Sequence, residues 1–141
     1  MAFVHGKVSV FKLDNAAGSL QDLSAYCDSI DFPQTLETAE VTTFGDTAKE
    51  YIVGLTDSTL SVSGSWDATL DAHMQGVLAA MAAGTQTTAT FEYGPEGSAA
   101  TKVKYTGECI ITSFGQTGAV GDKVTFSAEF QVTGAVTRTT F

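Results

Sequence analysis

The chain has 141 residues, 43 % of them hydrophobic and 16 % charged, which suits one globular domain and excludes disorder by composition. A net charge of −9 with scattered Lys and Arg argues against tight binding to the phosphate backbone of a nucleic acid, because such binding needs grouped cations. No apolar run approaches the roughly 18 residues of a membrane span, and the first residues lack a signal-peptide pattern. We therefore expect a protein made in the cytoplasm, with no membrane partner.

Three β-strands are predicted before residue 45. Apolar and polar residues alternate over residues 4–13 and partly over 20–32, with a turn between the two runs. Pro33 interrupts the second run, because proline cannot donate to a sheet ladder. Residues 34–44 are rich in Thr and Val and form the third predicted strand.

A long connection follows at residues 45–57. A hairpin connection usually has about two to five residues. This one carries charges, two glycines and the apolar run from Tyr51 to Val53. Such a mixture asks for an explanation beyond joining two strands.

Residues 59–66 alternate regularly, with Leu60, Val62 and Trp66 on the side predicted to face the core. Asp67 is then placed to cap a helix by accepting a hydrogen bond from its first turn. We predict that helix over residues 68–83, ending at Gly84. One helical face gathers the large apolar side chains, namely Leu70, Met74, Val77, Leu78 and Met81. His73 lies outside that stripe and is predicted to be exposed.

Three more strands are predicted over residues 87–93, 102–114 and 122–136. The last has the clearest alternation in the chain. Its predicted inward side chains are Val124, Phe126, Ala128, Phe130 and Val132. Its outward side chains include Lys123, Thr125, Ser127, Glu129 and Gln131. With about seven strands and one helix, the predicted fold is mainly β, with two packed β-sheets in a sandwich or partly open barrel and one flanking α-helix.

The sequence shows no catalytic constellation. His5 and His73 belong to no recognisable motif, and there is no phosphate-binding loop and no nucleophile elbow. Cys27 and Cys109 lie in alternating runs and are predicted to be reduced core residues, with a disulfide or a reactive thiol as alternatives. We expect no enzyme, no cofactor and no metal site.

A long string around residues 40–67 resembles the major tail tube proteins of long-tailed, siphovirus-type bacteriophages. The string is AEVTTFGDTAKEYIVGLTDSTLSVSGSWD, preceded by SAYCDSIDFPQTLE. One departure is Val53, where proline is common in the family. The resemblance covers about a third of the chain.

The resemblance implies a structural virion protein. Members of that family form hexameric rings that stack into a tube, and one sheet of each subunit joins its neighbours' sheets around a lumen through which genomic DNA passes without specific binding. It also implies tape-measure, tail-terminator and baseplate partners.

Two hypotheses about residues follow. We interpret residues 45–57 as an assembly arm that contacts a neighbouring subunit or ring; a self-contained Ω-loop is the alternative. The contact residues are Phe44, Asp46, Lys49, Glu50, Tyr51, Ile52, Leu55 and Asp57. The outward side chains of the last strand, from Lys123 to Gln131, are predicted to face the lumen. The alternative function is a β-sandwich binding or decoration module, Ig-like or carbohydrate-binding.

Overall fold

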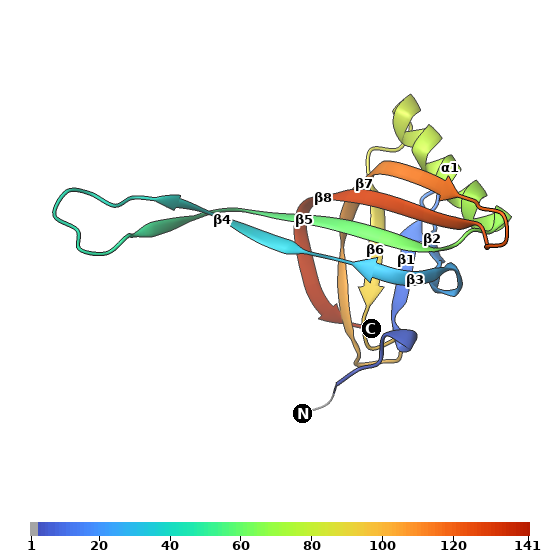
Figure 1. The fold of residues 1–141 in the computed structure, drawn as a ribbon, viewed down its shortest axis with the longest axis horizontal. Helices are drawn as coiled ribbons and strands as arrows, with labels where there is room; N and C mark the ends of the chain where they lie inside the picture. The colour runs from blue at the N-terminus through green and yellow to red at the C-terminus, as the bar shows by residue number, and fades with distance from the viewer. Residues whose placement is uncertain (1–2) are drawn as a thin grey trace.

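The structure is a computed structural model that describes residues 3–141, and its strands form one curled antiparallel sheet with a helix beside it and a long projecting hairpin (Figure 1). The strands are β1 (Val10–Asp14), β2 (Leu20–Asp22), β3 (Cys27–Asp31), β4 (Gln34–Glu40), β5 (Tyr51–Ser65), β6 (Ala89–Gly94), β7 (Val103–Thr117) and β8 (Thr125–Thr140). The helix α1 is Ala68–Ala83, and two 3-10 turns cover Gly6–Val8 and Ser24–Tyr26.

The sheet bends over itself. Its strand order is β2-β1-β6-β7-β8-β5-β3, and β4 pairs with β5 beyond β3. Phe11 of β1 and Phe130 of β8 nevertheless have ring centroids only 6.5 Å apart, although two strands lie between them in the sheet. The two halves of the sheet therefore face each other across a shared core. The predicted mainly-β fold, a partly open barrel with one flanking helix, is confirmed.

The alternation of β8 supplies much of that core. Phe126, Ala128, Phe130 and Val132 are buried, as their period of two predicts. Val124 was expected among them, but it precedes the strand and is 44 % exposed. The alternation in the sequence therefore identifies the buried face of β8 correctly. It is wrong only for Val124, which lies before the first residue of the strand.

The helix begins and ends where the sequence predicts. Leu70, Met74 and Val77 are fully buried against the strands, and Gly84 takes the left-handed C-cap conformation with φ = 80°. Asp67 occupies the N-cap position, but its carboxylate makes no capping hydrogen bond, which corrects that part of the prediction. No helix among the described residues is long and apolar enough to span a membrane.

Local hydrogen bonds break the first two predicted strands. His5 accepts from the backbone N–H of Lys7 through Nδ1 at 3.1 Å, and residues 6–8 turn instead of extending. In the second run, the Ser24 backbone N–H donates to the Asp22 carboxylate at 2.9 Å, and the 3-10 turn there separates β2 from β3. Short polar side chains that bond to the nearby backbone compete with the sheet ladder in this way.

His73 is half-buried rather than exposed, which corrects the prediction. Its Nε2 lies 3.1 Å from the backbone carbonyl oxygen of Asp14. Burial lowers the pKa of its imidazole, and the hydrogen bond to Asp14 partly opposes that shift. His73 therefore joins α1 to the end of β1.

Candidate assembly interface

A two-stranded hairpin extends away from the body of the molecule (Figure 1). It consists of β4, the loop of residues 41–50 and the first half of β5, and its register runs from Gln34 opposite Ser58 to Glu40 opposite Tyr51. We call residues 34–58 the arm. The expectation of a loop over 45–57 is therefore wrong in its bounds, because residues 51–57 are paired strand.

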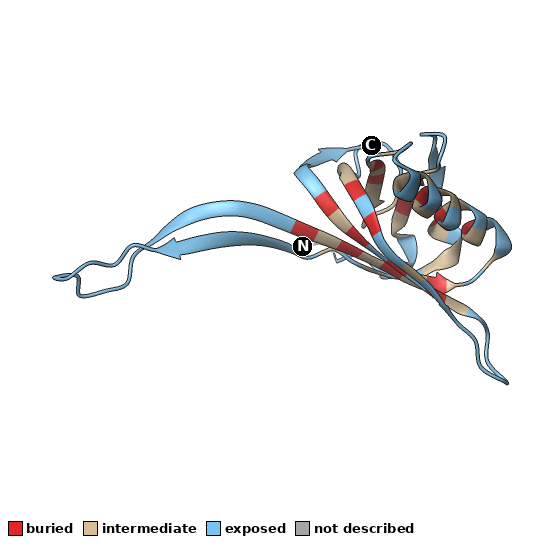
Figure 2. Ribbon diagram, turned by 90° about the horizontal axis from the view of Figure 1, so that it is seen from above, coloured by how far each residue is buried: buried red, intermediate tan, exposed pale blue. Residues whose placement is uncertain are grey.

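The arm exposes large apolar side chains, whereas the exposed strands of a monomeric protein normally carry few of them. Every residue from 34 to 57 is exposed, and along the same strand Val53 is 70 % and Leu55 77 % exposed, whereas Leu60 is fully buried. Figure 2 shows the change from exposed to buried along β5. The large apolar residues exposed in the arm are Leu36, Val41, Phe44, Tyr51, Ile52, Val53 and Leu55. An Ω-loop would pack such side chains against one another.

Both faces of the arm carry exposed apolar side chains. Directly paired residues of an antiparallel ladder share a face, so Tyr51 lies on the side of Glu40, and Ile52 lies on the opposite side with Ala39. The register shifts between Leu36 and Thr38, which is a β-bulge that takes in residues 54–55. The bulge fits a glycine at 54, since a Cβ there would lie 3.0 Å from the Cβ of Glu37.

The tip of the arm is shaped by its own hydrogen bonds. The Asp46 carboxylate accepts from the backbone N–H of Thr43 at 2.7 Å, and the Glu50 N–H donates to the Thr42 hydroxyl at 2.9 Å. Phe44 stands fully exposed at this tip. Asp46 is thus engaged within the turn, whereas Phe44 has its whole side chain available for a contact.

The root of the arm is tied to the body. The Gln131 amide of β8 donates to the Asp57 carboxylate at 2.7 Å and to the Ser58 carbonyl at 3.0 Å. Asp57 also accepts from the backbone N–H of Ser58. Two predicted site residues, Asp57 and Gln131, therefore meet each other and join the root of the arm to β8.

The outward face of the β7-β8-β5-β3 segment is rich in hydroxyl groups. Ser113, Glu129, Ser61 and Asp31 are successive partners across the four strands, and so are Gly115, Ser127, Ser63 and Ser29. Thr125 pairs with Ser65 at the end of the same face. The predicted residues Thr125, Ser127 and Glu129 therefore do share one outward face.

Lys123 precedes β8 and reaches the end of this face. Its ammonium donates to the Ser65 hydroxyl at 3.0 Å and lies 3.9 Å from a carboxylate oxygen of Asp28. One cation beside several carboxylates leaves the face acidic.

The two outer edges of this four-stranded segment are open in the part of the chain that the structure describes. β3 pairs with β5 alone, and the stretch of β7 after Ile111 pairs with β8 alone, because β6 reaches only as far as Cys109. Unpaired backbone groups at such edges are a template for adding another strand.

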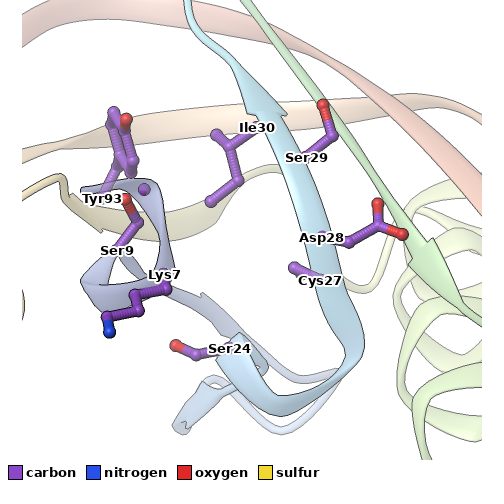
Figure 3. A pocket seen from close by; sticks show the side chains of 9 residues that line it. Lys7, Ser9, Ser24, Cys27, Asp28, Ser29, Ile30 and Tyr93 are labelled. Carbon is purple, nitrogen blue, oxygen red and sulfur yellow. The ribbon is translucent and has the colours of Figure 1, made fainter.

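A hollow with a mixed polar and apolar lining contains the half-buried thiol of Cys27 in its wall (Figure 3). It has a volume of about 340 Å³ and lies between the first 3-10 turn and β3, with Ser9, Ser24, Cys27 and Tyr93 in its lining. The Cys27 thiol donates to the Leu23 carbonyl, and burial raises its pKa to about 12. Cys109 is fully buried, burial raises its pKa to about 12 as well, and neither cysteine forms a disulfide.

No group of three or more His, Cys, Asp or Glu side chains within residues 3–141 is placed to hold a metal ion. Three other features distinguish the described surface, namely the apolar side chains of the arm, the open sheet edges and the hydroxyl-rich face. Exposed apolar side chains and unpaired sheet edges suit contacts between protein surfaces.

Comparison with solved structures finds the same fold in tails and tubes. The chain is similar to a subunit from the tail of an empty gene transfer agent (GTA) particle solved with C6 symmetry, with a TM-score of 0.77 and 18 % identity over 97 % of this chain and 99 % of that one. The SPP1 tail tube gives 0.72 and 14 % over 99 % and 80 %. The sheath–tube complex of an extracellular contractile injection system gives 0.70 and 7 % over 99 % and 93 %.

Comparison with curated proteins gave no match. A family model described as phage tail tube protein matches residues 5–138, nearly the whole chain. The chain therefore belongs to the phage tail tube protein family and is a structural protein of the tail tube.

Proposed function

We propose that this chain assembles into six-membered rings, that the rings stack into a tail tube, and that genomic DNA leaves through the lumen. The observation that carries the proposal is the arm, which exposes apolar side chains on both faces at the end of a strand that is otherwise part of the core. Exposed apolar surface of this kind marks an interaction site. A tube is built from many copies of its subunit, so we take the partner of the arm to be another copy of this chain.

The arm supplies the contacts between copies in this proposal. Tyr51, Ile52 and Leu55 act as apolar anchors, and Phe44 extends them at the tip. Lys49 and Glu50 set the register by charge pairing, because charges contribute more to specificity than to affinity. Asp46 and Asp57 act through contacts inside their own subunit. The Asp46 carboxylate shapes the tip of the arm, and the Asp57 carboxylate ties its root to Gln131.

Ring closure uses the two open edges. If β7 of one copy pairs with β3 of the next, the β7-β8-β5-β3 segments join into one continuous cylinder of strands. The C6 symmetry recorded for the similar GTA tail supports a ring of six. Closure would remove the exposed edges and so prevent uncontrolled strand addition.

The hydroxyl-rich outward face lines the lumen in this arrangement. Thr125, Ser127 and Glu129 would face the DNA, with Gln131 and Lys123 at the two ends of the row. Short hydroxyls keep the wall hydrated, and carboxylates repel phosphate, so DNA slides without sticking. The protein would be made in the host cytoplasm, reside in the virion and contact tape-measure, terminator and baseplate proteins.

Glu129→Lys tests the lumen assignment. A cation repeated around each ring would attract phosphate, so we expect tubes of normal appearance and slower DNA ejection, measured as dye-labelled DNA released over time. Glu129→Gln is the matched control. A failure of the lysine variant to form tubes would place Glu129 at a contact between subunits instead.

Negative-stain electron microscopy of the concentrated protein tests the proposed assembly directly. We expect hollow tubes whose end views show six subunits. A chain that stays monomeric at every concentration, and also beside its own tail-tip initiation complex, would contradict the proposal.

A further inference from the structure

Phe32 and Pro33 connect β3 to the arm and interrupt the pairing along β5. β3 ends at Asp31 and β4 begins at Gln34, and both strands lie on the same edge of β5. Between them, the Pro33 carbonyl accepts from the Thr59 N–H at 3.3 Å. Because Thr59 is also the first residue of β5 that pairs with β8, the interruption lies where the arm leaves the body.

The side chain of Phe32 reaches strands that pair with neither β3 nor the arm. Its ring centroid lies 5.6 Å from that of Phe91 and 6.3 Å from that of Tyr93, both on β6, and 5.9 Å from that of Tyr105 on β7. All three contacts are edge-to-face, a geometry that aromatic pairs favour. Phe91 is fully buried, and Tyr93 and Tyr105 are stacked on each other. The chain is therefore anchored to the opposite half of the sheet immediately before the arm begins.

The connection next to this anchor is stiff. Proline fixes its own φ and restricts the residue before it to extended conformations. The backbone of Phe32 and Pro33 therefore has little freedom, and the position of the Phe32 ring is passed on to β4, which begins with the next residue.

The second strand of the arm has a tie of its own. The Gln131 amide of β8 bonds to the Asp57 carboxylate and to the Ser58 carbonyl at the end of the arm. Each strand of the arm is thus tied once to the body, β4 through the ring of Phe32 and β5 through Gln131.

The body gives the arm little support beyond these two ties. A groove of about 550 Å³ lies between residues of both arm strands and the end of β8, where Gly134, Ala135 and Val136 form its wall. β8 turns away from β5 at this point (Figure 1), with φ = 79° at Gly134. Every residue from 34 to 57 is exposed, so packing against the body does not set the direction of the arm.

We propose that Phe32 is a positioning residue that braces the arm, so that the arm points in one direction in the free subunit. Association costs orientational freedom, and a part that is already held loses less of it when a partner binds. The benefit for tube formation rests on the proposed function. The brace itself is a property of the single subunit, and the two can be tested separately.

Distances between two spin labels test the brace in the free subunit. Nitroxides are attached at Val53→Cys on the arm and Gln75→Cys on α1, both exposed positions. Burial raises the pKa of Cys27 and Cys109 to about 12, so at neutral pH the label reacts with the introduced cysteines. Double electron–electron resonance then records the distribution of label distances below the concentration at which tubes form. Labelling of the wild type gives the background.

The width of that distribution separates a brace from an ordinary core residue. We expect one narrow peak in the otherwise unchanged chain and a clearly broader distribution in Phe32→Ala. Phe114→Ala is the matched control, because it removes a half-buried ring that packs on Phe126 instead. Its stability should fall while its peak stays narrow. Phe32→Leu keeps an apolar side chain and should also broaden the peak, so it provides the test if the alanine variant does not fold.

Equal widths in the unchanged chain and in Phe32→Leu would overturn the inference, and so would equal broadening in Phe114→Ala, since the loosening would then follow from lost stability alone. For tubes, we expect Phe32→Leu to raise the concentration needed for assembly about tenfold, equal to about 1.4 kcal/mol, with little change for Phe114→Ala. Absence of wild-type tubes, even with the initiation complex, would contradict the proposed function and not the brace, which is measured in the single subunit.

Discussion

The two halves of β5 have different environments although they belong to one strand. From Leu60 to Ser65, alternate side chains enter the core beside β8, whereas Val53 and Leu55 stand in solvent on a two-stranded ribbon. An isolated two-stranded hairpin is marginally stable in water at best. The core half therefore stabilises the subunit, and the arm half presents the apolar surface that we propose contacts a second copy. Variants of the two halves should separate folding from assembly.

Phe130→Ala should have the largest effect on folding. Phe130 is buried between the two halves of the sheet, and removing a buried phenyl ring costs about 3–5 kcal/mol in the free energy of unfolding. Urea unfolding of the monomer measures this loss. A cost below about 1 kcal/mol would mean that the curled sheet is not held together by this contact.

Gly64→Ala should come next. A Cβ at position 64 would lie 2.0 Å from the Tyr26 carbonyl oxygen, and backbone cannot move aside as a flexible side chain can. Overpacking of this kind costs about 1–3 kcal/mol, measured in the same urea experiment. Gly76→Ala is the matched control, because its added Cβ would meet only Ala16 at an ordinary 3.7 Å.

The double change Tyr51→Ser and Leu55→Ser should barely affect the monomer and should abolish tubes. Both side chains are exposed, so the free energy of unfolding should stay within about 0.5 kcal/mol of the wild type. Electron microscopy of the concentrated variant should show dispersed subunits. Normal tubes from this variant would remove the arm from the account, and a large loss of monomer stability would mean that the arm supports its own subunit.

His73→Gln should have the smallest effect, and it should depend on pH. Burial lowers the pKa of His73 in the fold, so the unfolded chain takes up the proton more readily once the pH falls below the ordinary value near 6.5. The wild type should therefore lose more stability than the variant between pH 7.5 and pH 5.5. Equal losses in paired urea curves would show that His73 does not contribute to the pH dependence.

The sequence predicts the core half better than the arm half, for a physical reason. A strand or helix with one buried face leaves a period in the sequence, and residues 68–83 and 125–133 show it. The arm has no buried face and contains a bulge, so its strand pairing leaves no regular alternation in the sequence. For that reason the sequence does not identify Leu36 and Val53 as exposed apolar residues of the arm. Trp66 is predicted to face the core, but it follows the end of β5 and is 37 % exposed. That prediction is wrong because it extends the alternation past the last residue of the strand.

The resemblance, rather than the periodicity, pointed to Tyr51, Ile52 and Leu55. Nothing in the sequence alone could show that Asp57 and Gln131 meet, because 74 residues separate them and the register of β5 on β8 decides the contact.

Hydrogen exchange of the backbone amides in monomer and tube tests the central claim most directly. If the arm is unpartnered in the monomer and covered in the tube, amides of residues 34–58 should exchange far more slowly after assembly, while those of the buried stretch of β8 change little. Equal exchange of the arm in both states would contradict the account, because the apolar surface would then remain in solvent in the finished tube.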